Sequence, residues 1–152
     1  MSEHRQSVRV GIVTTWFERG AALVSRAYME TMSREHDVFI YARGGEMYGQ
    51  HDPRWHLANV TWGKRVDPIH GTNIDWVDFS DWVRQHELDI VLFNEQHYWR
   101  VILQWQDLDV LIGAYIDYYT EETVPFFALY DFLICNTHRH YSVFKNHPQA
   151  LY

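Results

Sequence analysis

A run of polar side chains with hydroxyl-binding chemistry interrupts the apolar pattern of this 152-residue sequence. Asn94, Glu95, Gln96 and His97 follow directly on the apolar run Ile90 to Phe93. Their amide, carboxylate and imidazole groups supply both hydrogen-bond donors and acceptors. Further candidates follow two later apolar runs: Asp117, Tyr118 and Asn136. This mixture of polar groups with aromatic neighbours predicts a cleft that binds a sugar or another polyol.

Asp117 is the candidate for acid–base chemistry in this set. Its carboxylate could serve as a general base or bind a cation, alone or with Glu121 and Glu122. The plainer interpretation of Glu121 and Glu122 is a solvated pair at a helix start, where the helix dipole stabilises acidic groups. Because every strand must end in polar residues, simple exposure explains any one of these residues by itself. The prediction of a site therefore depends on the set.

Small residues follow the first apolar run, in the segment Arg19-Gly20-Ala21-Ala22, and they open a helix. Backbone amides and the positive end of the helix dipole could accept a phosphate or a carboxylate there. Close packing of the helix on a strand is the alternative explanation. The fingerprint Gly-x-Gly-x-x-Gly does not follow this run, since Gly11 lies inside it, and no Walker loop is present. Both absences argue against a dehydrogenase and a nucleoside triphosphatase.

The sequence contains ten histidines and one cysteine, and neither residue type predicts a metal site. The tightest histidine pair, His138 and His140, has no cysteine partner nearby, so solvent-facing histidines are the favoured explanation. We therefore predict no metal. Cys135 lies in the apolar run Phe132 to Cys135 and is expected to be a small buried hydrophobic residue.

Five short apolar runs must position these residues: Val8 to Val13, Val38 to Ala42, Ile90 to Phe93, Val110 to Ile116 and Phe132 to Cys135. Most are continuous rather than alternating, which is typical of parallel strands covered on both faces. Segments with helical spacing separate them. We expect helices over Ala21 to Glu35, from a cap at Thr72 or Asn73 to Leu88, and over Trp99 to Trp105, Val124 to Tyr130 and Arg139 to Lys145.

The repeated order of strand, helix and strand predicts a doubly wound, mainly parallel α/β sheet with helices on both faces, formed by residues 1–152 as a single domain. The exception is the long excursion Arg43 to Asn73, which is rich in glycine and aromatic residues. We expect it to carry an edge strand at Asn59 to Trp62 and to form a loop over a site. In such a sheet the ligand crevice lies at the carboxyl ends of the strands, where the strand order reverses. The polar candidates fall at these strand ends.

Net charge and hydropathy restrict the kinds of partner that the protein can bind and its association with membranes. With 13 basic against 20 acidic residues the formal net charge is −7, and the basic residues do not cluster, which disfavours a nucleic-acid partner. No run approaches the ~20 apolar residues that a membrane span requires. We expect a soluble, cytoplasmic protein, with peripheral association at the inner face of a membrane left open.

Several short motifs resemble those of one enzyme family. They are the strand and loop Val10 to Thr15, the segment Arg19 to Ala22, the strand entry Glu35 to Val38, and the later stretches Leu88 to Asn94 and Tyr130 to Thr137. In this order they are similar to the start of a GT-B glycosyltransferase, and more narrowly of the large retaining group called family 4 or group 1. The strand entry matches that family's "G-H-x-V" pattern.

The resemblance implies that the chain is the N-terminal, Rossmann-like half of a GT-B fold, which in the family mainly holds the acceptor. The C-terminal donor-binding domain, with its Glu-x7-Glu pair, is absent from this chain. The loop at Gly20 and Ala21 would face the donor diphosphate, and Asp117 would line the cleft near the reacting sugar. Gly20-Ala21 departs from the more usual Gly-Gly. The resemblance implies no metal and no cofactor, the nucleotide-diphosphate sugar being a substrate.

The sequence thus predicts the acceptor-binding domain of a glycosyltransferase that moves a sugar from a nucleotide-diphosphate sugar to a hydroxyl acceptor. The expected roles are acceptor binding by Asn94, Glu95, Gln96, His97, Tyr118 and Asn136, polarisation of the acceptor hydroxyl by Asp117, and contact with the donor phosphates by Arg19, Gly20 and Ala21. We expect the isolated domain to be inactive, because transfer requires both reactants in one geometry. Two alternatives are a flavodoxin-like module that binds a sugar or nucleotide, and a protein-interaction domain anchored by tryptophans.

Overall fold

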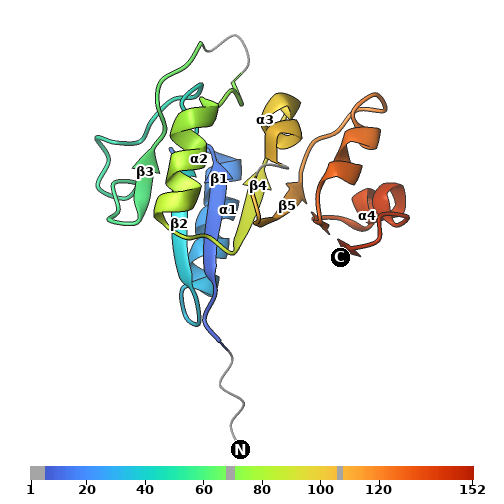
Figure 1. Cartoon of the computed structure of the whole chain (residues 1–152). Coiled ribbons are helices and arrows are strands. Elements are labelled where there is room, and N and C mark those ends of the chain that lie inside the picture. The colour runs from blue at the N-terminus through green and yellow to red at the C-terminus, as the bar shows by residue number, and fades with distance from the viewer. Residues whose placement is uncertain (1–5, 68–70, 106–107) are drawn as a thin grey trace, which may run out of the picture.

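A computed structural model describes residues 6–67, 71–105 and 108–152 of the chain. Within these residues, seven strands form one all-parallel sheet in the order β3-β2-β1-β4-β5-β6-β7 (Figure 1). The strands are β1 (Arg9–Thr14), β2 (Asp37–Ala42), β3 (Val60–Trp62), β4 (Ile90–Asn94), β5 (Leu111–Ile116), β6 (Phe132–Cys135) and β7 (Ala150–Leu151). The predicted doubly wound α/β class is confirmed, as is the edge strand that ends at Trp62. The strand order reverses between β1 and β4.

Helices cover both faces of the sheet, as the continuous apolar strands predict. They are α1 (Gly20–Met32), α2 (Trp76–Gln85), α3 (Trp99–Gln104), the 3-10 helix η2 (Val124–Leu129) and α4 (His138–Phe144). Figure 1 shows α1 behind the sheet and α2 in front of it. In the described part of the chain, no helix has both the length and the apolarity needed to cross a membrane.

One detail of the predicted helices was wrong. The side chain of Asp75, and not of Thr72 or Asn73, caps α2 by accepting a hydrogen bond from the backbone N–H of Asp78 at 3.0 Å. Thr72 is unable to cap the helix because its hydroxyl accepts from the backbone N–H of His97 instead. The segment that begins at Val124 forms a helix, as predicted, and this helix is of the 3-10 type.

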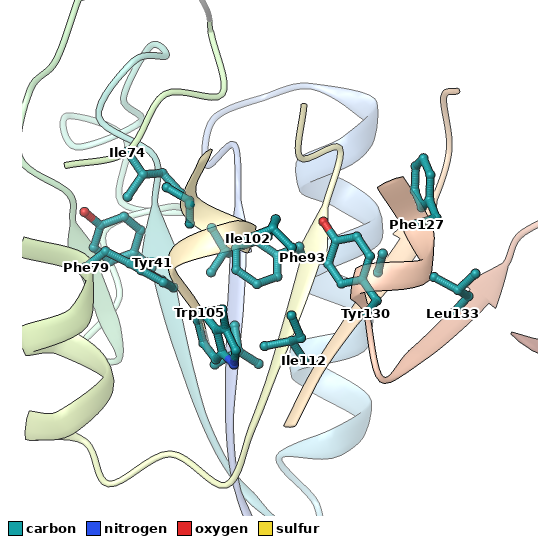
Figure 2. Packing of buried hydrophobic residues seen from close by; sticks show 14 of the residues in the cluster. Tyr41, Ile74, Phe79, Phe93, Ile102, Trp105, Ile112, Phe127, Tyr130 and Leu133 are labelled. Atoms are coloured by element: carbon teal, nitrogen blue, oxygen red, sulfur yellow. The ribbon is translucent and has the colours of Figure 1, made fainter. Parts of the chain in front are cut away.

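The core has two layers, one on each face of the sheet. The face under α2 and α3 is packed mainly with aromatic rings, shown in Figure 2. Phe79 of α2 lies at its centre, with ring centroids 5.2 Å from Tyr41, 5.9 Å from Phe93 and 5.6 Å from Trp105. The face under α1 is packed mainly with aliphatic residues, together with the rings of Trp16 and Trp55. Cys135 is buried in the aromatic layer as a free thiol, which confirms its predicted burial.

Gly44, just after β2, allows two chain segments to approach closely. A methyl group at this position would lie 1.8 Å from the backbone carbonyl oxygen of Lys64, which follows β3. Because backbone atoms are unable to move aside as a flexible side chain does, we expect Gly44→Ala to lower the free energy of unfolding by about 1–3 kcal/mol. Urea denaturation measures this change.

Gly20→Ala is the matched control, because a methyl group at Gly20 would meet no neighbouring atom within 4 Å outside its own turn. We expect it to change the free energy of unfolding by less than about 0.5 kcal/mol. Equal stabilities of the two variants would contradict the close approach at Gly44.

Candidate functional site

A cavity of about 860 Å³ opens at the carboxyl ends of the strands, where the strand order reverses between β1 and β4. This is the position at which doubly wound sheets bind their ligands. Its lining combines charged, hydroxyl and aromatic side chains: Arg19, Glu46, Gly71, Thr72, Glu95, His97, Tyr98, Asp117 and Tyr118.

Five of the residues predicted from the sequence therefore meet in one cavity: Arg19, Glu95, His97, Asp117 and Tyr118. They come from the ends of three different strands, β1, β4 and β5. The imidazole of His97 and the ring of Tyr118 lie edge to face, with centroids 5.4 Å apart. The structure thus brings a guanidinium, two carboxylates, an imidazole and a phenol around one space.

Sequence reasoning missed three polar members of the lining, Glu46, Thr72 and Tyr98. Glu46 and Thr72 belong to the long excursion after β2, whose glycine-rich composition does predict a loop over a site. Nothing in the spacing of that loop, however, distinguishes Glu46 from its neighbours. Tyr98 directly follows the predicted polar run and lies at the start of α3.

Two predicted acceptor-binding residues, Asn94 and Gln96, lie behind the cavity wall rather than in it. Their exposed fractions are 2% and 4%. The amide of Asn94 donates to the carbonyl oxygen of Ala21 and to the hydroxyl of Ser25, each at 2.9 Å. The amide of Gln96 donates to the carbonyl oxygen of Thr72 at 2.9 Å. Both side chains therefore hold the wall in place.

Arg43 fixes the floor of the site. It directly follows β2, is 1% exposed, and donates from Nε to Glu46 at 2.8 Å. Its Nη1 donates to the backbone carbonyl of Asn94 at 2.6 Å and to Oε1 of Gln96 at 3.3 Å. Glu95 lies between these last two residues, so one buried guanidinium holds both Glu46 and the turn that carries Glu95.

The charged residues form a chain of contacts that follows the order of the strands. Arg19, after β1, approaches Glu46 at 3.4 Å and Glu95 at 3.1 Å. Glu95, after β4, is hydrogen-bonded to Asp117, after β5. Asp117 in turn accepts from the amide of Asn136, after β6, at 3.2 Å. Asn136 thus supports the cavity from outside its lining.

Burial and neighbouring charges change the protonation of two cavity residues. Burial raises the pKa of Glu95, and so does its hydrogen bond to Asp117, whereas the guanidinium of Arg19 lowers it. Burial lowers the pKa of His97, with a further lowering from Arg43 and Arg19. His97 is therefore neutral at neutral pH, and its two ring nitrogens can donate one hydrogen bond and accept another.

The start of α1 has free hydrogen-bonding capacity next to this cavity. Arg19 occupies the N-cap position with an extended backbone, and no side chain caps the helix or adds an acidic group to its first turn. The first backbone amides of a helix lack partners within it, so they can bind an external anion. Gly20 is exposed and Ala21 is buried; neither residue is part of the cavity lining.

Among the residues that the structure describes, no group of three or more histidine, cysteine, aspartate or glutamate side chains is placed to hold a metal ion. The side chains that line the cavity supply carboxylates, a neutral imidazole and hydroxyl groups, with the positive charge of Arg19 at one edge.

Sheet order, helices on both faces and a cavity at the reversal point together define a Rossmann-like α/β domain. Three solved structures of alpha-glucosyltransferases resemble it. One, in complex with UDP and a 13-mer DNA containing a HMU base, has a TM-score of 0.55 at 10% identity over 84% of this chain and 37% of that chain. A second, in complex with UDP-glucose and DNA containing an abasic site, has a TM-score of 0.57 at 10% identity over 95% and 42%. A third, in complex with UDP and a 13-mer DNA containing a central A:G mismatch, has a TM-score of 0.54 at 11% identity over 87% and 38%.

The fold therefore matches one Rossmann-like half of a GT-B glucosyltransferase. The chain spans about two fifths of the length of these enzymes. No protein-family model matches the sequence. No curated protein matches it either.

Proposed function

We propose that this chain is the acceptor-binding half of a glycosyltransferase that transfers a sugar from a nucleotide-diphosphate sugar to a hydroxyl group. The observation that carries the proposal is the cavity between the carboxyl ends of β1 and β4, where the strand order reverses. Its lining includes Glu95, His97, Asp117 and Tyr118. The resemblance of the fold to half of a GT-B glucosyltransferase supports it. A second domain, outside these 152 residues, would hold the nucleotide.

The acceptor binds, in this proposal, among side chains that match the hydroxyl groups of a sugar. Asp117 accepts a hydrogen bond from the reacting hydroxyl and orients its oxygen for attack. The neutral imidazole of His97 donates to one hydroxyl or accepts from another. Tyr118, which is exposed at the cavity rim, supplies an aromatic surface for the apolar face of a sugar ring.

The donor phosphates approach the opposite edge of the cavity. The uncapped start of α1 offers the backbone amides of Gly20 and Ala21, and Arg19 adds a positive charge. The side chain of Arg19 is 46% exposed, so its guanidinium can turn from Glu46 and Glu95 toward a phosphate. Charge-assisted hydrogen bonds from guanidinium to phosphate are among the strong ones in proteins.

A sugar or glycan fits this chain better as an acceptor than the DNA in the glucosyltransferase complexes. Three carboxylates line the cavity, on Glu46, Glu95 and Asp117, and the whole chain has a net charge of −7. A polyphosphate backbone would be repelled by this surface. A neutral polyol meets no such repulsion, and its hydroxyl groups donate to the carboxylates.

Binding of maltose and of UDP-glucose, followed by backbone amide shifts in NMR, tests the proposal. We expect maltose to shift amides near Glu95, His97 and Asp117, and UDP-glucose to shift those of Gly20 and Ala21. Asp117→Asn removes a charged acceptor, so it is expected to weaken maltose binding by about tenfold. Asp81→Asn, a matched change on the outer face of α2, should leave binding unchanged, since that carboxylate is 70% exposed.

Shifts that map away from the cavity, or equal maltose affinity of Asp117→Asn and the unmodified chain, would count against the acceptor site. UDP-glucose shifts without any response to sugars would favour a nucleotide-binding module of the flavodoxin-like kind instead.

A further inference from the structure

We propose that the acceptor is a disaccharide or a longer glycan, and that a second cavity, next to the first, binds the sugar attached to the reacting one. This inference rests on the proposed function and deepens it, since it names the class of acceptor. The first cavity holds the sugar whose hydroxyl group faces Asp117, and the second cavity holds the neighbouring sugar.

The second cavity has a volume of about 350 Å³ and is lined by residues at the start of α2 and along α3. Its lining includes Asp75, Trp76, Tyr98, Arg100 and Gln104. Ligand cavities in proteins begin at about 300 Å³, so this space is large enough to bind a small ligand. Tyr98 lines both cavities, and the two spaces therefore adjoin at this residue. A ligand made of two linked rings can occupy both cavities at once.

The segment 71–75 holds the two cavities in a fixed relative position. Gly71 and Thr72 line the first cavity, whereas residues 73–75 line the second. Thr72, at the boundary, is bound to the turn that follows β4. Its hydroxyl accepts from the backbone N–H of His97 at 3.1 Å, and its carbonyl oxygen accepts from the amide of Gln96 at 2.9 Å. This preorganisation lowers the entropic cost of binding a ligand that extends over both cavities.

The polar groups of the second cavity match the hydroxyl groups of a sugar. The carboxylate of Asp75 accepts from the backbone N–H of Asp78 at 3.0 Å and from Nζ of Lys64 at 3.1 Å. These hydrogen bonds lower the pKa of Asp75, so its carboxylate is ionised at neutral pH and can accept a further hydrogen bond from a hydroxyl group. Arg100 adds donors, and the amide of Gln104 can both donate and accept.

Trp76 supplies an aromatic surface in the second cavity. Its side chain is half-buried and packs on Phe79, with ring centroids 6.1 Å apart, so the core fixes the position of the indole. The same residue lines the cavity. The second cavity thus combines one aromatic residue with several polar groups, as the first cavity does with Tyr118, and this combination suits a ring with an apolar face and polar edges.

The charge of the second cavity favours a sugar over the phosphates of the donor. Its lining carries two carboxylates, on Asp67 and Asp75, against the single guanidinium of Arg100. A diphosphate would be repelled by this excess of negative charge. An uncharged sugar meets no such repulsion. The second cavity therefore extends the acceptor side of the site and not the donor side.

Binding of one-ring and two-ring sugars, followed by NMR, tests this inference. The probes are methyl α-glucoside and the disaccharides maltose, isomaltose and cellobiose. We expect all sugars that bind to shift amides near Glu95 and Asp117. At least one disaccharide should also shift the amides of Arg100 and Gln104 and the indole N–H of Trp76. That disaccharide should bind about tenfold more tightly than methyl α-glucoside, because its second ring adds hydrogen bonds.

Gln104→Ala removes a polar group from the second cavity alone. It should weaken binding of the preferred disaccharide by about three- to tenfold and leave the affinity for methyl α-glucoside unchanged. Gln85→Ala is the matched control. Each glutamine is the last residue of its helix, α3 for Gln104 and α2 for Gln85, and Gln85 is exposed at the opposite end of α2 from Trp76. This control should change neither affinity.

Four outcomes would contradict the inference. Disaccharides that bind no more tightly than methyl α-glucoside, with shifts confined to the first cavity, would overturn the second subsite and leave the proposed function intact. An equal loss of affinity for both kinds of sugar in Gln104→Ala would do the same. UDP-glucose that shifts the amides of Arg100 and Gln104 would assign the second cavity to the donor. The absence of any sugar-induced shift near Asp117 would overturn both the subsite and the proposed function.

Discussion

Phe79→Ala is expected to lower the free energy of unfolding by about 3–5 kcal/mol. Phe79 is fully buried in the aromatic layer, where its ring packs against those of Tyr41, Trp82, Phe93 and Trp105. Figure 2 shows Phe79 beside Tyr41. These rings belong to α2, to the residue that follows α3 and to the strands β2 and β4, so no single neighbour can move to fill the space. Removing the ring takes away its burial and leaves a cavity. Urea denaturation followed by circular dichroism measures the change.

Phe126→Ala is the control with the same change of side chain. Phe126 lies in η2, is 41% exposed, and stacks on Trp99 with ring centroids 5.3 Å apart. Because most of its contact is with solvent and one ring, we expect a loss of about 1 kcal/mol or less. Similar losses for both variants would show that the aromatic layer is not packed as described.

Arg43→Met is expected to destabilise the protein by about 3–5 kcal/mol, because it removes one partner from a buried ion pair. Glu46 then loses the guanidinium to which it is bound at 2.8 Å, and the turn around Glu95 loses two of its hydrogen bonds. The variant should therefore also weaken maltose binding in the folded fraction. Unfolding in urea and amide shifts with maltose, measured on the same samples, separate these two effects.

Two further variants test whether the loss of stability comes from the buried ion pair. Arg84→Met removes an arginine that is 58% exposed and 3.8 Å from Asp81, so it should cost less than about 1 kcal/mol. The double variant Arg43→Met with Glu46→Gln should recover part of the lost stability, since it also removes the carboxylate to which Arg43 is bound. A loss below about 1 kcal/mol for Arg43→Met alone would mean that the buried pair does not organise the floor of the site.

The sheet could be predicted from the sequence because its strands carry a strong and simple signal. The five apolar runs are nearly continuous, and burial on both faces requires this continuity. The strand β7 was missed because Ala150–Leu151 is too short to form a run of its own and depends on pairing with β6. The cap of α2 was misplaced because Thr72, Asn73 and Asp75 are all good capping residues, and only the tertiary contact of Thr72 with His97 decides among them.

The candidate site could be predicted in its location but not in all of its members. Polar residues at strand ends identify the edge of the sheet, which is why Glu95, His97 and Asp117 meet there. Whether a side chain enters the cavity or turns under it depends on the backbone conformation of the turn. The left-handed conformation of Glu95 separates it from Asn94 and Gln96, and the sequence has no glycine to mark this position.

The reversal of strand order also has a kinetic consequence. The pairing of β1 with β4 joins segments far apart in the chain, and Arg9 donates its backbone N–H to Asp89 across 80 residues. Closing so long a loop is entropically costly and slow. The site is divided by this pairing. Arg19, Arg43 and Glu46 follow the strands β1 and β2, whereas Glu95 and Asp117 follow the strands β4 and β5. The site therefore forms only when β1 pairs with β4. A local opening that separates β1 from β4 disrupts the whole site, whereas fraying of the edge strand β7 leaves it intact.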